Sequence, residues 1–147
     1  MRVATMKTFA THSAAETIEL GRRLATELKP GNLVLLRGDL GAGKTTLVKG
    51  IAEGFQAAEA DRVTSPTFTL IHEYRGSQVT LYHIDLYRVD TARELDTLAI
   101  DDLMDANSIL LIEWGEKFER FVRERDVEIA IEHGSGDDRL VVVTSRA

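Results

Sequence analysis

The segment from Gly38 to Thr46 has the residue types and spacing that proteins use to hold the phosphates of a nucleotide. Its letters GDLGAGKT match the pattern G-x-x-x-x-G-K-[ST] in full. Glycines allow a tight turn whose N–H groups point inward, and the next helix adds the positive end of its dipole. Lys44 can bridge the β- and γ-phosphates, while the Thr45 hydroxyl is placed to ligate Mg²⁺. The predicted nucleotide-binding residues are Gly38, Gly41, Ala42, Gly43, Lys44, Thr45 and Thr46.

A motif of this length also arises by chance, in roughly one random chain of this size in a few hundred. The segments on either side of the motif argue against a chance match. An unbroken apolar run from Leu33 to Leu36 precedes it, as is typical of a strand at the centre of a parallel sheet. An amphipathic helix is predicted to follow, from Lys44 to about Gly54. Strand, glycine loop and helix are thus consecutive, which is the context that the motif requires.

A hydrolase of this kind also needs an acidic residue at the end of a neighbouring strand, and two are available. Glu113 ends the continuous apolar run 109–112, whereas Asp85 ends the more alternating segment 79–84. A continuous run favours a central strand beside the phosphate loop, so Glu113 is the better magnesium ligand together with Thr45, and Asp85 should lie farther out. The predicted catalytic set is Lys44, Asp85 and Glu113, and either acid could orient the attacking water.

The elements that must position these residues indicate an α/β fold: a single P-loop NTPase-like domain over residues 1–147, with a mixed central β-sheet flanked by helices. A first helix should begin near Ser13 and end before Pro30. Residues 68–74 and 79–82 should form an antiparallel hairpin. Further helices are predicted over 92–104 and 116–122, and further strands over 108–112, 127–131 and 140–143.

The composition narrows the functional classes. A net charge of -6 disfavours direct binding to a nucleic-acid backbone, and the absence of cysteine excludes disulfides and thiolate metal sites. No apolar run approaches the length of a membrane span, and the first residues lack the core of a signal peptide. The expected location is therefore the cytoplasm, without a membrane partner.

An ATPase is one of several functions that a P-loop can serve. A GTPase is disfavoured because neither Asn32 nor Asn107 is followed by lysine, so the guanine-selective Asn-Lys-x-Asp sequence is missing. A small-molecule kinase would share the loop and also use ATP with Mg²⁺. A regulatory module that binds ATP and hydrolyses it hardly at all is a third reading. The sequence alone does not separate the last from a slow ATPase.

Four motifs in order give a more specific indication: GDLGAGKTT, SPTF at Ser65 to Phe68, HIDLYR at His83 to Arg88, and EWGE at Glu113 to Glu116. Together they resemble the TsaE (YjeE) family, bacterial ATPases required for making threonylcarbamoyladenosine in tRNA. The resemblance runs over most of the chain. It implies a P-loop ATPase, slow on its own, that joins the TsaB and TsaD proteins and meets tRNA only through that complex, while TsaD performs the transfer.

The resemblance also implies roles for single residues. Lys44 and Thr45 would bind the phosphates and metal, Glu113 would complete the metal site, and Asp85 would take part in activity. The SPTF segment resembles a switch loop that senses the γ-phosphate through Thr67. The same residues are equally typical of the start of a β-strand in which Pro66 makes the backbone rigid.

Overall fold

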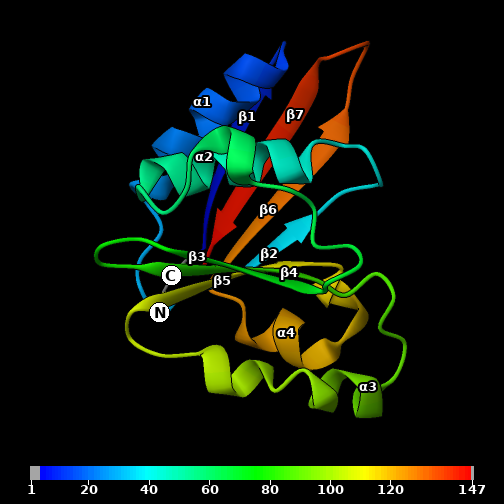
Figure 1. Ribbon diagram of the computed structural model, residues 1–147. Coiled ribbons are helices and arrows are strands. Elements are labelled where there is room, and N and C mark those ends of the chain that lie inside the picture. Colours follow the sequence, from blue (N-terminus) through cyan, green and yellow to red (C-terminus); the bar gives the residue numbers. More distant parts are fainter. Residues whose placement is uncertain (1–3, 147) are drawn as a thin grey trace.

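Two buried parallel strands, Leu33–Arg37 (β2) and Ser108–Glu113 (β5), form the centre of a seven-stranded sheet in the computed structural model, which describes residues 4–146. The strand order is β1-β7-β6-β2-β5-β4-β3. Strands β4, β5, β2 and β6 run parallel, and the pairs at both edges are antiparallel, so the predicted mixed sheet is confirmed (Figure 1). The outer strands are β1 (Thr5–Thr11), β3 (Ile71–Arg75), β4 (Thr80–Asp85), β6 (Val127–His133) and β7 (Arg139–Ser145).

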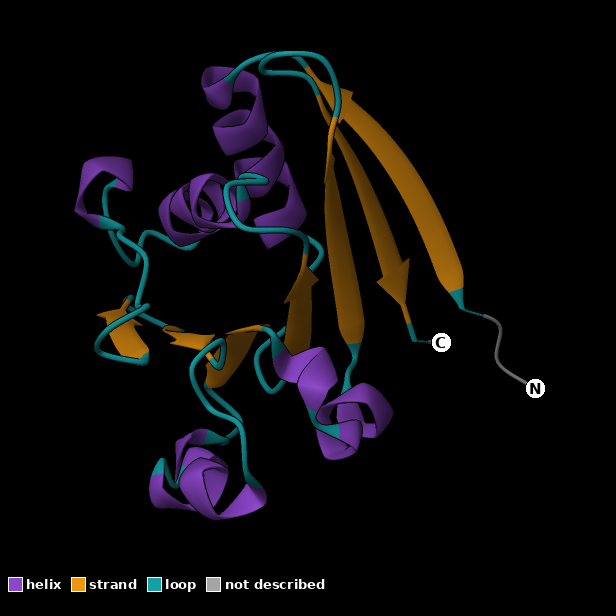
Figure 2. Cartoon of the chain, turned by 90° about the vertical axis from the view of Figure 1, so that its right-hand side faces the viewer, coloured by secondary structure: helices purple, strands orange, loops and turns teal. Residues whose placement is uncertain are grey.

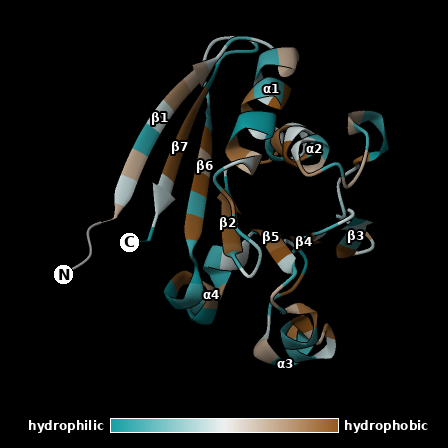
Figure 3. Ribbon diagram, turned by 90° about the vertical axis from the view of Figure 1, so that its left-hand side faces the viewer, coloured by the Kyte–Doolittle hydropathy of each residue, from teal (hydrophilic) through white to brown (hydrophobic). Residues whose placement is uncertain are grey.

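Helices cover both faces of this sheet because its central strands are apolar on both sides. Val34 and Leu36 pack toward α1 (Ala14–Ala25) and α2 (Lys44–Gly54), whereas Leu33 and Leu35 belong to the core on the opposite face. That second face carries α3 (Ala92–Thr97) and α4 (Glu119–Glu124) (Figure 2). The central strands are coloured predominantly hydrophobic in Figure 3. Packing on both faces fixes the position of β2, and therefore also the position of the phosphate loop that begins at its end.

The two helices on the first face approach each other backbone to backbone. A Cβ placed on Gly50 would lie 1.9 Å from the carbonyl oxygen of Ile18, and one on Gly21 would lie 2.4 Å from that of Leu47. Only glycine fits at such a distance. The pair of glycines therefore sets the position of α2, the helix that begins at the phosphate loop.

Several predicted boundaries differ from the structure. The first helix ends at Ala25, although its cap is as expected, with Ser13 Oγ accepting from Glu16 N at 3.1 Å. The helix expected over 92–104 is α3 followed by a 3-10 turn, Ile100–Leu103 (η2), and that over 116–122 is a 3-10 turn, Gly115–Lys117 (η3), leading into α4. Strand β3 begins only at Ile71, because Phe68 lies in a turn and is 82% exposed. Strand β1 was not predicted.

Between residues 4 and 146, the structure contains no helix long and apolar enough to cross a membrane.

Candidate functional site

The phosphate loop joins the end of β2 to the start of α2, and its shape depends on glycine at two positions. Gly43, the residue before the helix, has φ 110°, a left-handed conformation that side chains disfavour. A Cβ on Gly38 would lie 2.7 Å from the carbonyl oxygen of Ile131 in β6. These positions match the two invariant glycines of the motif, so the spacing seen in the sequence has a structural cause.

The start of α2 offers free hydrogen-bond donors. Within residues 4–146, the backbone N–H groups of Lys44, Thr45 and Thr46 donate to no oxygen of the chain, as is usual for the first turn of a helix. They lie at the positive end of the helix dipole. Such a terminus attracts phosphate oxygens without further help, so this end of α2 can bind an anion.

Lys44 is held inside the protein, with only 5% of its surface exposed. Its ammonium donates to the carbonyl oxygen of Gly38 at 2.6 Å and lies 3.7 Å from Glu113 Oε1. It also lies 4.3 Å from the ring centre of Trp114. Its positive charge is thus balanced by a carbonyl, a carboxylate and an aromatic face, and a phosphate entering the loop would compete with these groups.

The two predicted acids end adjacent strands and are register partners, Asp85 on β4 and Glu113 on β5. Strand β5 lies next to β2 and β4 lies one strand farther out, as the sequence predicted. Both side chains are buried and lie on the face of α2, because each follows the alternation that turns Leu81 and Leu111 to that face. The structure therefore brings both carboxylates to the same end of the sheet.

The two carboxylates have different partners. Glu113 Oε2 lies 2.5 Å from Nε2 of His83, a histidine that is completely buried. Asp85 Oδ1 accepts from the backbone N–H of Tyr87 at 2.8 Å, and its Oδ2 accepts from the hydroxyl of Thr67 at 3.2 Å. The SPTF segment is thus tied to Asp85 through Thr67. His83 lies two residues before Asp85 in the chain, but its hydrogen-bond partner is Glu113.

The oxygen atoms at this end of the sheet fit a magnesium ion. Mg²⁺ prefers hard oxygen ligands and is usually held by one or two protein groups together with phosphates. The hydroxyl of Thr45 and the carboxylate of Glu113 are donors of this kind, and Glu113 lies beside the Lys44 ammonium that the motif assigns to the phosphates. These two residues could hold the ion.

Arg139 is a functional candidate that sequence reasoning left unassigned. It begins β7 and donates from Nε to the carbonyl oxygen of Ala42 at 2.8 Å. The hairpin formed by β6 and β7 is thus hydrogen-bonded to the phosphate loop. Its Nη1 donates to the carbonyl oxygens of Gly136 and Asp138, both at 2.8 Å. Because Arg139 and Ala42 are 97 positions apart, no local sequence pattern indicates this contact.

The same hairpin loop contacts the start of α1 through His12. His12 Nδ1 lies 3.0 Å from Asp138 Oδ1, and this hydrogen bond raises the pKa of His12 above its ordinary value. The raised pKa means that the contact stabilises the folded protein below about pH 6.5 and that this contribution is lost as the pH rises through the folded-state value.

Changing Asp138 to Asn is expected to lower the pKa of His12 toward its ordinary value, because the histidine loses the carboxylate that favours its charged form. An NMR titration of the His12 ring measures this. Asp137→Asn is the matched control, since no hydrogen bond joins Asp137 to His12 in the described part of the chain. An unchanged titration in the Asp138 variant would show that the contact does not persist in solution.

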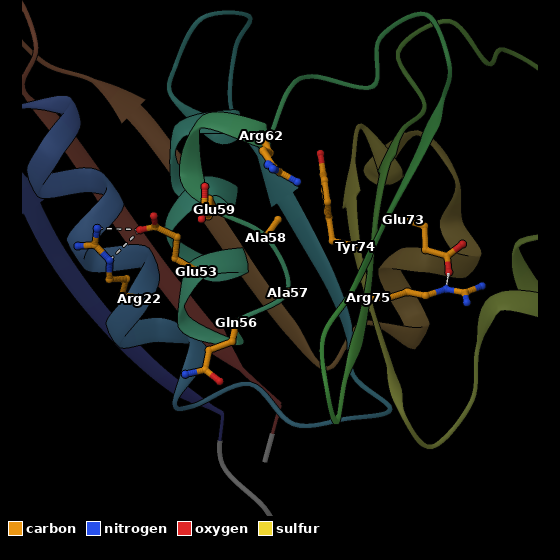
Figure 4. A pocket seen from close by; sticks show the side chains of 10 residues that line it. All are labelled: Arg22, Glu53, Gln56, Ala57, Ala58, Glu59, Arg62, Glu73, Tyr74 and Arg75. Carbon is orange, nitrogen blue, oxygen red and sulfur yellow. Dashed lines mark hydrogen bonds and ion pairs between the residues drawn. The ribbon is translucent and has the colours of Figure 1, made fainter.

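A cavity of about 830 Å³ opens at the other end of α2, away from the phosphate loop. Figure 4 shows Arg62 and Tyr74 projecting into the space between the end of α2 and β3. Side chains of both positive and negative charge line the cavity. Within the ion pairs Arg22–Glu53 and Arg75–Glu73, the two charges neutralise each other. None of the predicted nucleotide-binding residues lines it. The candidate site is therefore the loop at the start of α2 and not this cavity.

Comparison with known proteins gives consistent matches. The family model for "Threonylcarbamoyl adenosine biosynthesis protein TsaE" matches residues 11–141. The tRNA threonylcarbamoyladenosine biosynthesis protein TsaE of Bacillus subtilis is 37% identical over 130 residues, which is 88% of this chain and 80% of the relative. That of Streptomyces coelicolor is 42% identical over 123 residues, covering 81% and 80%. The crystal structure of Bacillus subtilis YdiB superposes with a TM-score of 0.78 at 31% identity, covering 100% of this chain and 90% of that one.

Proposed function

The chain belongs to the TsaE family, and we propose that it binds and slowly hydrolyses ATP in the formation of threonylcarbamoyladenosine on tRNA. The observation that carries this proposal is the start of α2, where three backbone N–H groups have no hydrogen-bond partner within residues 4–146 and the Lys44 ammonium lies beside the carboxylate of Glu113. Residues 1–147 would act as one P-loop ATPase domain, and work on tRNA would locate it in the cytoplasm.

The residues of the site divide the work of phosphoryl transfer. The loop N–H groups and Lys44 hold the β- and γ-phosphates and neutralise charge that develops on them. Thr45 and Glu113 would hold the magnesium ion, which would supply further positive charge to the site. Transfer of the γ-phosphoryl group in such a site needs no covalent intermediate with the protein.

We assign orientation of the attacking water to Asp85. Glu113 is held by the buried His83 and lies beside the Lys44 ammonium that the motif assigns to the phosphates, so its carboxylate is suited to a fixed position next to the metal. Asp85 is bonded to Thr67 of the SPTF segment, whose hydroxyl can exchange this bond for one to a γ-phosphate oxygen. The contact between Thr67 and Asp85 supports the switch interpretation of SPTF over a purely structural one.

The partners proposed from the family are TsaB and TsaD, with tRNA met only through their complex. The arginine bonded to the loop, Arg139, uses Nε and Nη1 on carbonyl oxygens, which limits its use for stabilising transferred phosphate. A group supplied by a partner can provide that charge. Slow hydrolysis by the isolated protein follows from this arrangement.

Phosphate release by the purified protein is expected to be slow and to rise by at least about tenfold when TsaB, TsaD and tRNA are added, since a charge supplied in trans can accelerate transfer by about 10³ or more. Formation of the modified nucleoside in the same mixture should stop when this protein is omitted. A small-molecule kinase would give neither result. An unchanged rate together with normal modification in its absence would overturn the proposal.

A further inference from the structure

His83 is a fully buried histidine beside the candidate site, and the P-loop motif assigns it no role. It lies on β4 two residues before Asp85, and its register partner on β5 is Leu111, so Glu113 is its diagonal neighbour on the same face. Diagonal pairs across strands are within reach of long side chains. The hydrogen bond of 2.5 Å between His83 Nε2 and Glu113 Oε2 is therefore a direct product of strand register.

The contact with the carboxylate decides which nitrogen of His83 is the donor. His83 is 0% exposed, and its Nδ1 has no hydrogen-bond partner in the described part of the chain. An ionised carboxylate only accepts, so Nε2 must donate to it. The hydrogen bond therefore places an N–H donor, Nε2–H, on the carboxylate of Glu113.

The two oxygens of Glu113 are consequently divided between two partners. His83 holds Oε2, while Oε1 lies 3.7 Å from the ammonium of Lys44. A carboxylate with one oxygen held by a rigid ring cannot rotate freely, and its other oxygen stays directed at the start of the phosphate loop. Groups that orient a ligand in this way raise its affinity for metal by fixing its geometry in advance.

We propose that His83 is a positioning residue that holds Glu113 Oε2, so that Oε1 is presented to the magnesium ion of bound Mg-ATP. The proposal rests on the proposed function, because it needs Mg-ATP in the loop. A positioning role for His83 depends on an N–H donor at the place of Nε2. A packing role would depend instead on the volume of the ring.

Two amides test this distinction, because Gln places its amide nitrogen near the position of Nε2 and Asn places it near that of Nδ1. In His83→Asn, the Mg²⁺ concentration for half-saturation is expected to rise about 10- to 100-fold, the usual effect of losing such a partner. In His83→Gln the rise should stay below about tenfold. Binding of ATP in excess EDTA should be the same in both variants, whereas the unfolding temperature should be lower for His83→Asn, which removes a partner of the buried Glu113 carboxylate.

The sole tryptophan gives a readout independent of turnover. The ring of Trp114 lies 4.3 Å from the Lys44 ammonium, so its fluorescence should report Mg²⁺ added to protein with a non-hydrolysable ATP analogue. In a Glu113→Gln background, His83→Asn should cause no further change, because the residue it positions is altered. Equal shifts in the Gln and Asn variants, or no shift in either, would overturn the proposal.

A second measurement remains decisive should His83→Asn fail to fold. Long-range ¹H–¹⁵N correlation spectra of the unaltered protein should show hydrogen on Nε2 of His83, the nitrogen that faces Glu113. An Nε2 without hydrogen would overturn the proposal. Failure of the proposed function is distinguishable from both results, because the unaltered protein would then show no Mg²⁺-dependent binding of the ATP analogue while its tautomer could still be read.

Discussion

Changing Lys44 to Ala is expected to lower the affinity for a magnesium-bound ATP analogue by about 100-fold, the upper range for losing hydrogen bonds to a charged group. The variant keeps the loop N–H groups but loses the ammonium that lies beside Glu113. Calorimetric titration measures the affinity. Lys49→Ala on the same helix is the control, because it removes the same charge outside the site. An affinity equal to that of the parent would exclude Lys44 from the phosphate site.

The same change should also lower stability, which the sequence did not predict. A lysine facing a ligand can be removed without harm to the fold, but Lys44 is 5% exposed and is one of the two side chains that contact the Glu113 carboxylate within residues 4–146. Removing one member of a buried pair costs about 3 kcal/mol. Denaturant unfolding measures this loss. Adding Glu113→Gln should restore much of the stability and none of the affinity, which separates the two effects.

Replacing Gly50 with Ala is expected to destabilise the protein by about 3 kcal/mol, at the upper end for overpacked cores. The added Cβ would lie 1.9 Å from the Ile18 carbonyl oxygen, so α1 and α2 must move apart. For a chain of this size the unfolding temperature should fall by roughly 10 °C. Since α2 begins at the phosphate loop, affinity for the ATP analogue should fall as well.

The control for this variant lies one residue earlier on the same helix. Lys49→Ala introduces the same side chain without a clash and favours the helix slightly, so its unfolding temperature should stay near that of the parent. A Gly50→Ala protein as stable as this control would mean that the two helices can separate without loss, and that their close approach does not determine where the loop lies.

Local patterns were enough to predict the elements that carry the site. The apolar runs of β2 and β5 correctly indicated adjacent parallel strands, and the glycines of the loop correctly indicated the start of α2. Continuity of those runs also placed Glu113 nearer to the loop than Asp85. The apolar character of each strand and the glycine turn depend on residues that are close in sequence, where periodicity and turn chemistry act directly.

The contacts that complete the site depend on residues far apart in the chain. Strand β1 was missed because residues 5–11 are mostly exposed on an edge strand and show no clear apolar face. The bond from Arg139 to Ala42 spans 97 positions, and that from His83 to Glu113 spans 30. Such pairs follow from strand order and register, which no single segment encodes.

The internal partners of Lys44 have a consequence for selectivity among anions. Any ion that enters the loop must draw the ammonium away from the Gly38 carbonyl and from Glu113, and must leave that buried carboxylate with another source of positive charge. Orthophosphate or sulfate, arriving alone, brings no such replacement. A polyphosphate carrying its own divalent cation does, so the resting arrangement of the loop would discriminate against the small anions abundant in a cell.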